Sequence, residues 1–236
     1  YMSTINEELT RQADAQLALF NRKLMPVTQR EILGVKVPDL RKMARQIVRT
    51  DDWQDWFYHV TDNDSFEEIM LRGMVLGYAH LDIDELLCGI RFYVPLIDEW
   101  ALCDCATATW KQLVKYPDKA FELITPYLNS DNEFEQRFAY TTLLAHFCTS
   151  TYIGRVLDLF GSSEPHGYYA LMGLSWALSV CYVKFPEPTA QLLQSDKLTT
   201  ECKRKAIQKI MESRRSTPEM RQRALLIRQT LKKNHS

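Results

Sequence analysis

Apolar side chains recur along most of this 236-residue chain at intervals of three and four positions, the spacing that gathers them on one face of an α-helix. Glycine and proline, with eight and nine copies, are scarce and mostly separate these periodic segments. The pattern therefore predicts an all-α protein.

Residues that favour helix N-termini mark where the predicted helices begin. Pro38 suits a first helical turn and predicts a helix that continues through residues 39–44. Side chains that can cap a helix predict the starts of later helices, at Asp51, Asp52, Asp64, Ser65, Asp82, Asn132 and Thr217.

The predicted helices form pairs at a constant interval. The second helix of each pair is expected to begin near Ser65, Asp98, Glu133, Gly167 and Thr200, a spacing of 33 to 35 residues. Such a repeat is typical of an α-α superhelix, or solenoid, of degenerate HEAT-like units around a concave cleft. We expect one domain over residues 1–236, with an N-terminal helical cap (1–50), helical pairs (51–213) and a basic C-terminal helix (214–236).

This register gives four residues a common position on the second helices. Trp100 and Asp104 are four apart and share one helix face. Arg137 falls at nearly the same place in the next pair, and Trp176 about one turn farther along in the pair after that. The spacing predicts that these side chains face one cleft.

Those residue types suit a flat cation attached to a polyanion. Two tryptophans can stack on a cationic ring. Asp104 could stabilise developing positive charge or orient a water, and Arg137 could bind a phosphate. The set fits loss of a charged base from a nucleotide, where the sugar becomes oxocarbenium-like. The alternative is that the tryptophans are core residues and that Asp104 and Arg137 form an ordinary ion pair between repeats.

Charge is distributed unevenly along the chain. Residues 22–49 carry +6 and residues 201–236 carry +8, whereas residues 50–200 carry −13. Basic segments at the rim of an acidic body are compatible with binding a polyanion backbone, although solvated helix faces would give the same pattern.

Several other classes of function find no support in the sequence. The five histidines are scattered, and the six cysteines lie singly in apolar helical patterns, so we expect reduced thiols and no metal site. Phosphate-binding, dinucleotide-binding and serine-hydrolase motifs are absent. No signal peptide or membrane-spanning run is evident, which favours a cytoplasmic protein.

The sequence resembles the AlkD-type DNA alkylation repair enzymes, bacterial alkylpurine DNA glycosylases built from HEAT-like repeats. The resemblance covers nearly the whole chain, including residues 33–42, 130–132 and 205–207. Its most specific motifs are Trp-x-x-x-Asp at 100–104, Gln-Arg-x-Ala at 136–139 and Trp-x-Leu at 176–178.

The resemblance implies excision of positively charged purines, such as 3-methyladenine and 7-methylguanine, from duplex DNA without a base-flipping pocket. It assigns Asp104 as the catalytic carboxylate, Trp100 and Trp176 as aromatic walls, and Arg137 as a DNA contact. Rim residues expected to bind the flanking backbone are Arg41, Lys42, Lys205 and Arg214. A monomer without metal or cofactor, associated with the nucleoid, is expected.

Two other functions remain open from the sequence. One is a non-catalytic solenoid that binds branched or distorted DNA by shape and charge. The other is a protein-interaction scaffold that keeps the fold without DNA binding.

Overall fold

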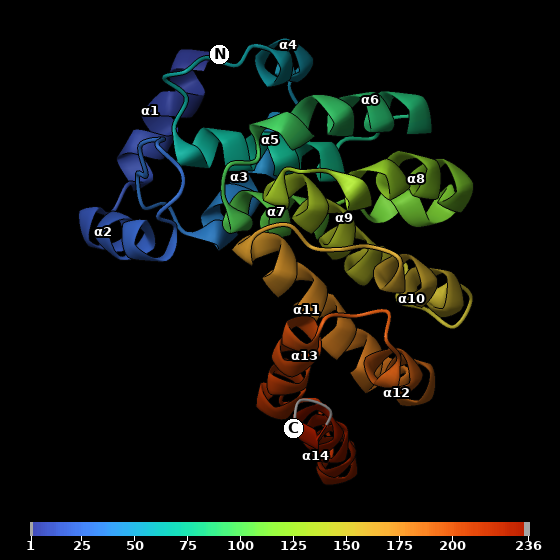
Figure 1. The fold of residues 1–236 in the computed structure, drawn as a ribbon. Coiled ribbons are helices and arrows are strands. Elements are labelled where there is room, and N and C mark those ends of the chain that lie inside the picture. Colours follow the sequence, from blue (N-terminus) through green and yellow to red (C-terminus); the bar gives the residue numbers. More distant parts are fainter. Residues whose placement is uncertain (1, 234–236) are drawn as a thin grey trace. The chain divides into compact units, whose positions relative to one another are not determined.

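The computed structural model describes the backbone of residues 2–233 and the side chains of residues 4–231. Within these residues the secondary structure is helical and contains no strand, which confirms the predicted all-α class (Figure 1). The chain divides into two compact units, Tyr1–Pro117 and Asp118–Ser236. No helix of the described residues has the length and apolar character needed to cross a bilayer.

The first unit consists of short helices joined by tight connections and one extended segment at 25–36. Its elements are α1 (Met2–Gln12), α2 (Ala15–Leu24), α3 (Val37–Ile47), α4 (Trp53–Tyr58), α5 (Phe66–Tyr78), α6 (Ile83–Tyr93), η1 (Val94–Leu96), α7 (Trp100–Thr107) and η2 (Lys111–Lys115).

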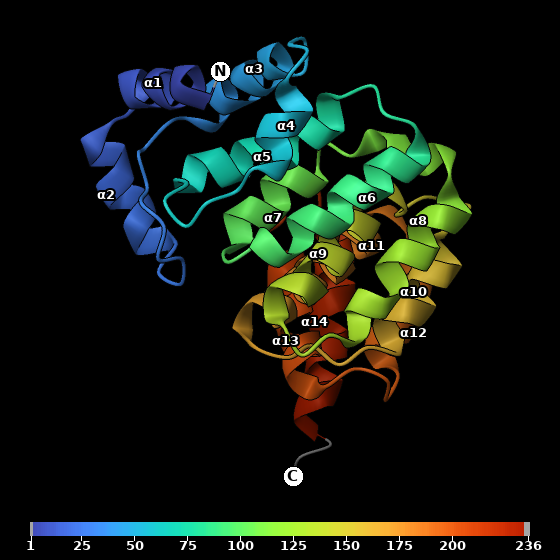
Figure 2. The same cartoon turned by 90° about the horizontal axis from the view of Figure 1, so that it is seen from above.

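The second unit contains the longest helices of the chain. Its elements are α8 (Pro117–Ile124), η3 (Thr125–Asn129), α9 (Glu133–His146), α10 (Ile153–Gly161), α11 (Tyr168–Lys184), α12 (Pro186–Gln194), α13 (Thr200–Glu212) and α14 (Pro218–Lys233). In Figure 2, α13 and α14 appear in orange and red, and these two helices pack against each other.

Local capping explains where the helices begin. Ser65 and Glu68 form a reciprocal capping box at the start of α5, and Asp82 and Glu85 form another at the start of α6. The Asn132 side chain accepts hydrogen bonds from two backbone N–H groups of α9. The predicted second helices begin within two residues of their expected positions, at Phe66, Trp100, Glu133, Tyr168 and Thr200.

These second helices pack against one another within each unit. In the first unit α5 contacts both α3 and α7, and in the second α11 contacts both α9 and α13 (Figure 1). A repeat of 32 to 35 residues thus returns the chain to an equivalent helix each time. This is the packing that a HEAT-like repeat requires, while the superhelical course of the whole chain stays a prediction.

The C-terminal helix begins at Pro218, directly after the predicted cap Thr217 and four residues after the expected segment boundary of 214. Proline suits a first helical turn, and the Thr217 hydroxyl accepts a hydrogen bond from the Met220 N–H at 3.2 Å. Arg214 therefore lies in the turn between α13 and α14.

A glycine allows α5 and α7 to approach closely. A Cβ atom on Gly73 would lie 2.5 Å from the Cβ of Ala106, which is too close for two carbon atoms. The fully buried Trp110 donates its indole N–H to the Gly73 carbonyl at 2.9 Å. This tryptophan is a core residue.

A buried arginine joins the end of α4 to α5. Arg72 is 1% exposed and donates to the carbonyls of Trp56, Phe57 and His59 at 3.3, 3.2 and 2.8 Å. Its guanidinium also pairs with Asp64 at 2.9 Å and lies over the Trp56 ring. Burial lowers the pKa of Arg72, and the Asp64 carboxylate opposes that shift. The contacts compensate for burying the charge.

Replacing Arg72 with methionine should strongly destabilise the first unit. The Arg72→Met variant leaves the Asp64 carboxylate, whose side chain is 11% exposed, without its cation and removes the guanidinium donor from three carbonyls. We therefore expect a loss of about 3–5 kcal/mol in urea denaturation. The matched control is Arg45→Met. Arg45 is exposed and packs over the Tyr78 ring at 4.5 Å, so its removal should cost no more than about 1 kcal/mol. Equal losses would contradict the role given to Arg72.

Candidate functional site

The predicted Trp-x-x-x-Asp pair lies on α7. Trp100 is the first residue of the helix and Asp104 follows one turn later, so both side chains share a face. Each is half-buried. The face therefore offers an indole ring and a carboxylate that are held by the helix and still reach solvent.

The orientation of Trp100 is set by two hydrogen bonds. Its backbone N–H donates to the Glu99 carboxylate at 3.1 Å, and its indole N–H donates to the Leu24 carbonyl at 3.1 Å. Leu24 ends α2, so the ring links α7 to a segment 76 residues earlier.

Charged neighbours surround the next turn of α7. The pKa of the Cys105 thiol is raised to about 11, first by burial and then by the Asp104 carboxylate, while the positive charge of Arg41 opposes the shift. Within the described residues, the buried Nε of Arg41 has no hydrogen-bond partner. Arg41, predicted as a rim residue, thus lies close enough to this turn to act on it electrostatically.

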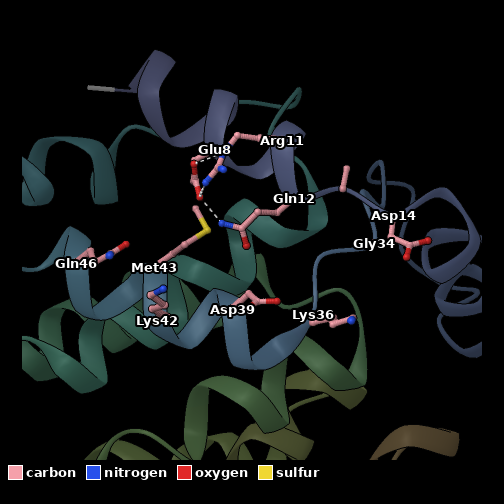
Figure 3. Close-up of a pocket in the computed structure, with 11 residues that line it drawn as sticks. Glu8, Arg11, Gln12, Asp14, Gly34, Lys36, Asp39, Lys42, Met43 and Gln46 are labelled. Atoms are coloured by element: carbon pink, nitrogen blue, oxygen red, sulfur yellow. Dashed lines mark hydrogen bonds and ion pairs between the residues drawn. The ribbon is translucent and has the colours of Figure 1, made fainter.

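Lys42 lies on α3 at a polar cavity of about 560 Å³ (Figure 3). The cavity is lined by α1, α3 and the connecting residues Ala13, Asp14, Gly34 and Lys36, and Arg11 pairs there with Glu8 at 2.6 Å. Its charged lining is balanced between cations and acids: Arg11, Lys36, Lys42, Glu8, Asp14 and Asp39. A balanced lining favours neither an anionic nor a cationic ligand.

In the second unit, α9 holds the start of α11. The Glu133 carboxylate accepts from the Tyr169 N–H at 2.7 Å, and the Arg137 guanidinium donates to the Tyr169 carbonyl at 3.0 Å. Arg137 is 7% exposed. Its geometry shows a structural contact to α11 in addition to the phosphate contact predicted from the sequence.

Trp176 lies farther along the same helix and is 37% exposed. Between the start of α11 and Trp176, Gly173 lets Arg137 pack closely, since a Cβ at this glycine would lie 3.1 Å from the Arg137 Cγ. Arg137 thus contacts the helix that carries Trp176. Of the other predicted cations, Lys205 is half-buried on α13 and Arg214 is exposed.

The structure thus brings two of the predicted groups together within each unit. Trp100 and Asp104 share α7, and Arg137 packs on the helix of Trp176. A single cleft formed by all four residues stays a prediction.

Sequence reasoning missed the carboxylates that organise these helices. Glu67, Glu99 and Glu133 occur at nearly constant spacing where α5, α7 and α9 begin, and each accepts backbone N–H groups from another segment. An acid repeated at or just before the first turn of three successive second helices is a signal that the repeat spacing alone could have revealed.

Enlarging Gly173 should displace Arg137 from α11. We expect Gly173→Leu to lower the free energy of unfolding by about 1–3 kcal/mol, because the side chain has no room. A Cβ on Gly154 meets nothing within 4 Å, so Gly154→Leu should instead stabilise α10 by up to about 1 kcal/mol. Thermal unfolding of both variants checks the prediction, and a stable Gly173→Leu protein would contradict it.

The thiol of Cys105 should report on Asp104. Its alkylation by iodoacetamide should rise with pH toward its pKa of about 11. Asp104→Asn removes a negative charge that raises this pKa, so the pH profile should shift to lower pH. Mass spectrometry in a Cys88→Ser background, which removes the exposed thiol, gives the rates. An unchanged profile would show that the carboxylate does not act on this turn.

Comparison with known proteins identifies the family. The sequence profile described as DNA alkylation repair enzyme matches residues 5–166, which is more than half of the chain. No curated protein matches the chain. The match includes Trp100, Asp104 and Arg137 and ends before α11, the helix that carries Tyr169 and Trp176. The chain therefore belongs to the DNA alkylation repair enzyme family.

Proposed function

We propose that this protein is a DNA glycosylase that hydrolyses the N-glycosidic bond of positively charged N3- and N7-alkylated purines in duplex DNA. The observation that carries the proposal is the α7 face, where Trp100 and Asp104 lie one turn apart and remain half-buried. Family membership supplies the class of substrate, which is alkylated DNA.

Because the lesion is itself positively charged, few catalytic groups are needed to break its N-glycosidic bond. A cationic purine is already a good leaving group, so the barrier lies mainly in the positive charge that develops on the sugar. A carboxylate held on a helix stabilises that charge without reorganising during the reaction. Asp104 therefore acts as an electrostatic stabiliser or orients the attacking water. The proposal requires no base-flipping pocket.

The two tryptophans suit the same cation. An indole face attracts a positively charged ring by cation–π interaction, worth about 0.5–2 kcal/mol according to desolvation. Trp100 has one edge fixed by the Leu24 carbonyl, and Trp176 is 37% exposed on α11. Each ring thus retains accessible surface for a flat ligand.

Basic residues outside the α7 face bind the DNA backbone in this proposal. Arg41 acts near α7, whereas Lys42 and Arg214 are exposed and Lys205 is half-buried. Phosphate contacts of this kind position the protein without reading sequence. Arg137 fixes the start of α11, and with only 7% of its surface exposed it contributes less to the phosphate contacts than the rim residues do.

Asp104→Asn should abolish excision while fold and DNA binding persist. We expect release of 7-methylguanine and 3-methyladenine from methylated duplex DNA to fall by about 10²-fold or more, since one preorganised charge is lost. Asp55→Asn, which changes an exposed acid on α4, is the control and should keep the wild-type rate. Excision by Asp104→Asn at the wild-type rate would exclude the role given to this carboxylate.

Absence of release by the folded wild-type protein would reject the glycosylase. DNA binding that weakens steeply with salt would then support a non-catalytic DNA-binding protein. Absence of DNA binding as well, with a protein partner whose capture survives Arg137→Ala, would support an interaction scaffold.

A further inference from the structure

Glu99 is a fully buried carboxylate that binds three backbone N–H groups. It is 0% exposed and immediately precedes Trp100. Its Oε2 accepts from the N–H groups of Val27 and Thr28 at 2.9 and 3.4 Å, and its Oε1 accepts from the Trp100 N–H at 3.1 Å. A buried charge of this kind persists only because these donors satisfy it.

These contacts close a ring of hydrogen bonds around Trp100. The Glu99 carboxylate fixes residues 27 and 28 against the start of α7. Leu24, at the end of α2 just before these residues, supplies the carbonyl that accepts from the Trp100 indole. Asp98 strengthens the attachment, because it accepts from the Thr28 hydroxyl at 2.9 Å. Trp100 is thus held at its backbone N–H by Glu99 and at its ring N–H by the Leu24 carbonyl. The Glu99 carboxylate fixes the residues next to Leu24 as well.

Glu67 provides a natural comparison. It is 1% exposed and accepts from the N–H groups of Leu33, Gly34 and Val35 at 2.9, 2.8 and 3.3 Å. The two carboxylates therefore hold neighbouring parts of the segment between α2 and α3. Only Glu99 adjoins an aromatic residue of the candidate site.

We propose that Glu99 is a positioning residue that fixes the Trp100 ring for contact with the alkylated base. The catalytic consequence of this inference rests on the proposed function, whereas the fixation of the ring is independent of it. An indole that rotates freely loses conformational entropy when it stacks on a ligand, whereas a ring already held in place does not. Glu99 thereby contributes to binding of the lesion without touching it.

Glutamine at position 99 keeps the volume of glutamate and changes its hydrogen bonding. The amide offers one acceptor oxygen, and its NH₂ group would face backbone N–H donors. Glu99→Gln therefore removes part of the attachment of residues 27 and 28. Glu67→Gln makes the same chemical change beside residues 33–35, and this variant is the matched control.

The first experiment monitors the environment of the Trp100 ring in the free protein by fluorine NMR, after incorporation of 5-fluorotryptophan. Absence of one signal in Trp100→Phe identifies the resonance of Trp100 among the five tryptophans. Glu99→Gln should shift or broaden that resonance, and Glu67→Gln should leave it in place. An unmoved resonance in Glu99→Gln, or equal shifts in both variants, would overturn the proposal.

The second experiment measures excision of 3-methyladenine in a double-mutant cycle. Glu99→Gln should lower kcat/KM by about tenfold when Trp100 is present, the effect of one hydrogen bond to a charged group. It should cause no further loss in Trp100→Ala, because Glu99 acts through that ring. Additive losses would show a merely structural role. Absence of excision by the wild-type protein would reject the proposed function and leave the NMR result standing.

Should Glu99→Gln fail to fold, Glu99→Asp keeps the buried charge with a shorter reach. Amide hydrogen exchange should then be faster at Val27 and Thr28 than in the wild-type protein, together with a shifted Trp100 resonance. Unchanged exchange at both amides and an unmoved resonance would contradict the attachment.

Discussion

This structure depends on hydrogen bonds between buried polar side chains and the backbone of another segment. In the first unit, Glu67 and Glu99 lie at the starts of α5 and α7 and together accept six backbone N–H hydrogen bonds. Five of these come from the connection between α2 and α3, which has no regular secondary structure to satisfy them. The two carboxylates thus accept the backbone N–H hydrogen bonds of this segment, which carbonyl groups of a sheet or helix would otherwise accept.

The second unit uses the same principle with different side chains. Glu133 and Arg137 hold the N–H and the carbonyl of Tyr169, and the buried Gln136 donates to the carbonyls of Leu128 and Glu164. Short helices bury little apolar surface each, so contacts between the end of one helix and the next connection fix their register.

The same contacts place the candidate functional groups on rigid supports. Trp100 lies beside the Glu99 carboxylate, and Trp176 lies on the helix that Arg137 attaches to α9. A group that must stabilise a short-lived charge is effective only if it is held before the charge appears. In this protein the residues that hold the site are also residues that stabilise the fold, which explains why the candidate site contains so many structural hydrogen bonds.

The sequence by itself determined the helical class, the starts of α5, α6 and α9, and the Trp100–Asp104 pair. Capping by Ser65, Asp82 and Asn132 and the four-residue spacing on α7 depend on neighbours within one or two turns, and such local rules can be applied to the sequence directly.

Only the tertiary structure decided the partners of Glu99 and Arg137. Glu99 binds Val27, 72 residues away, and Arg137 binds the carbonyl of Tyr169 in the next second helix. From the sequence, Arg137 was predicted to bind a phosphate, and no role was predicted for Glu99. The strength and direction of a charged hydrogen bond depend on which groups burial brings together, and sequence spacing does not specify that.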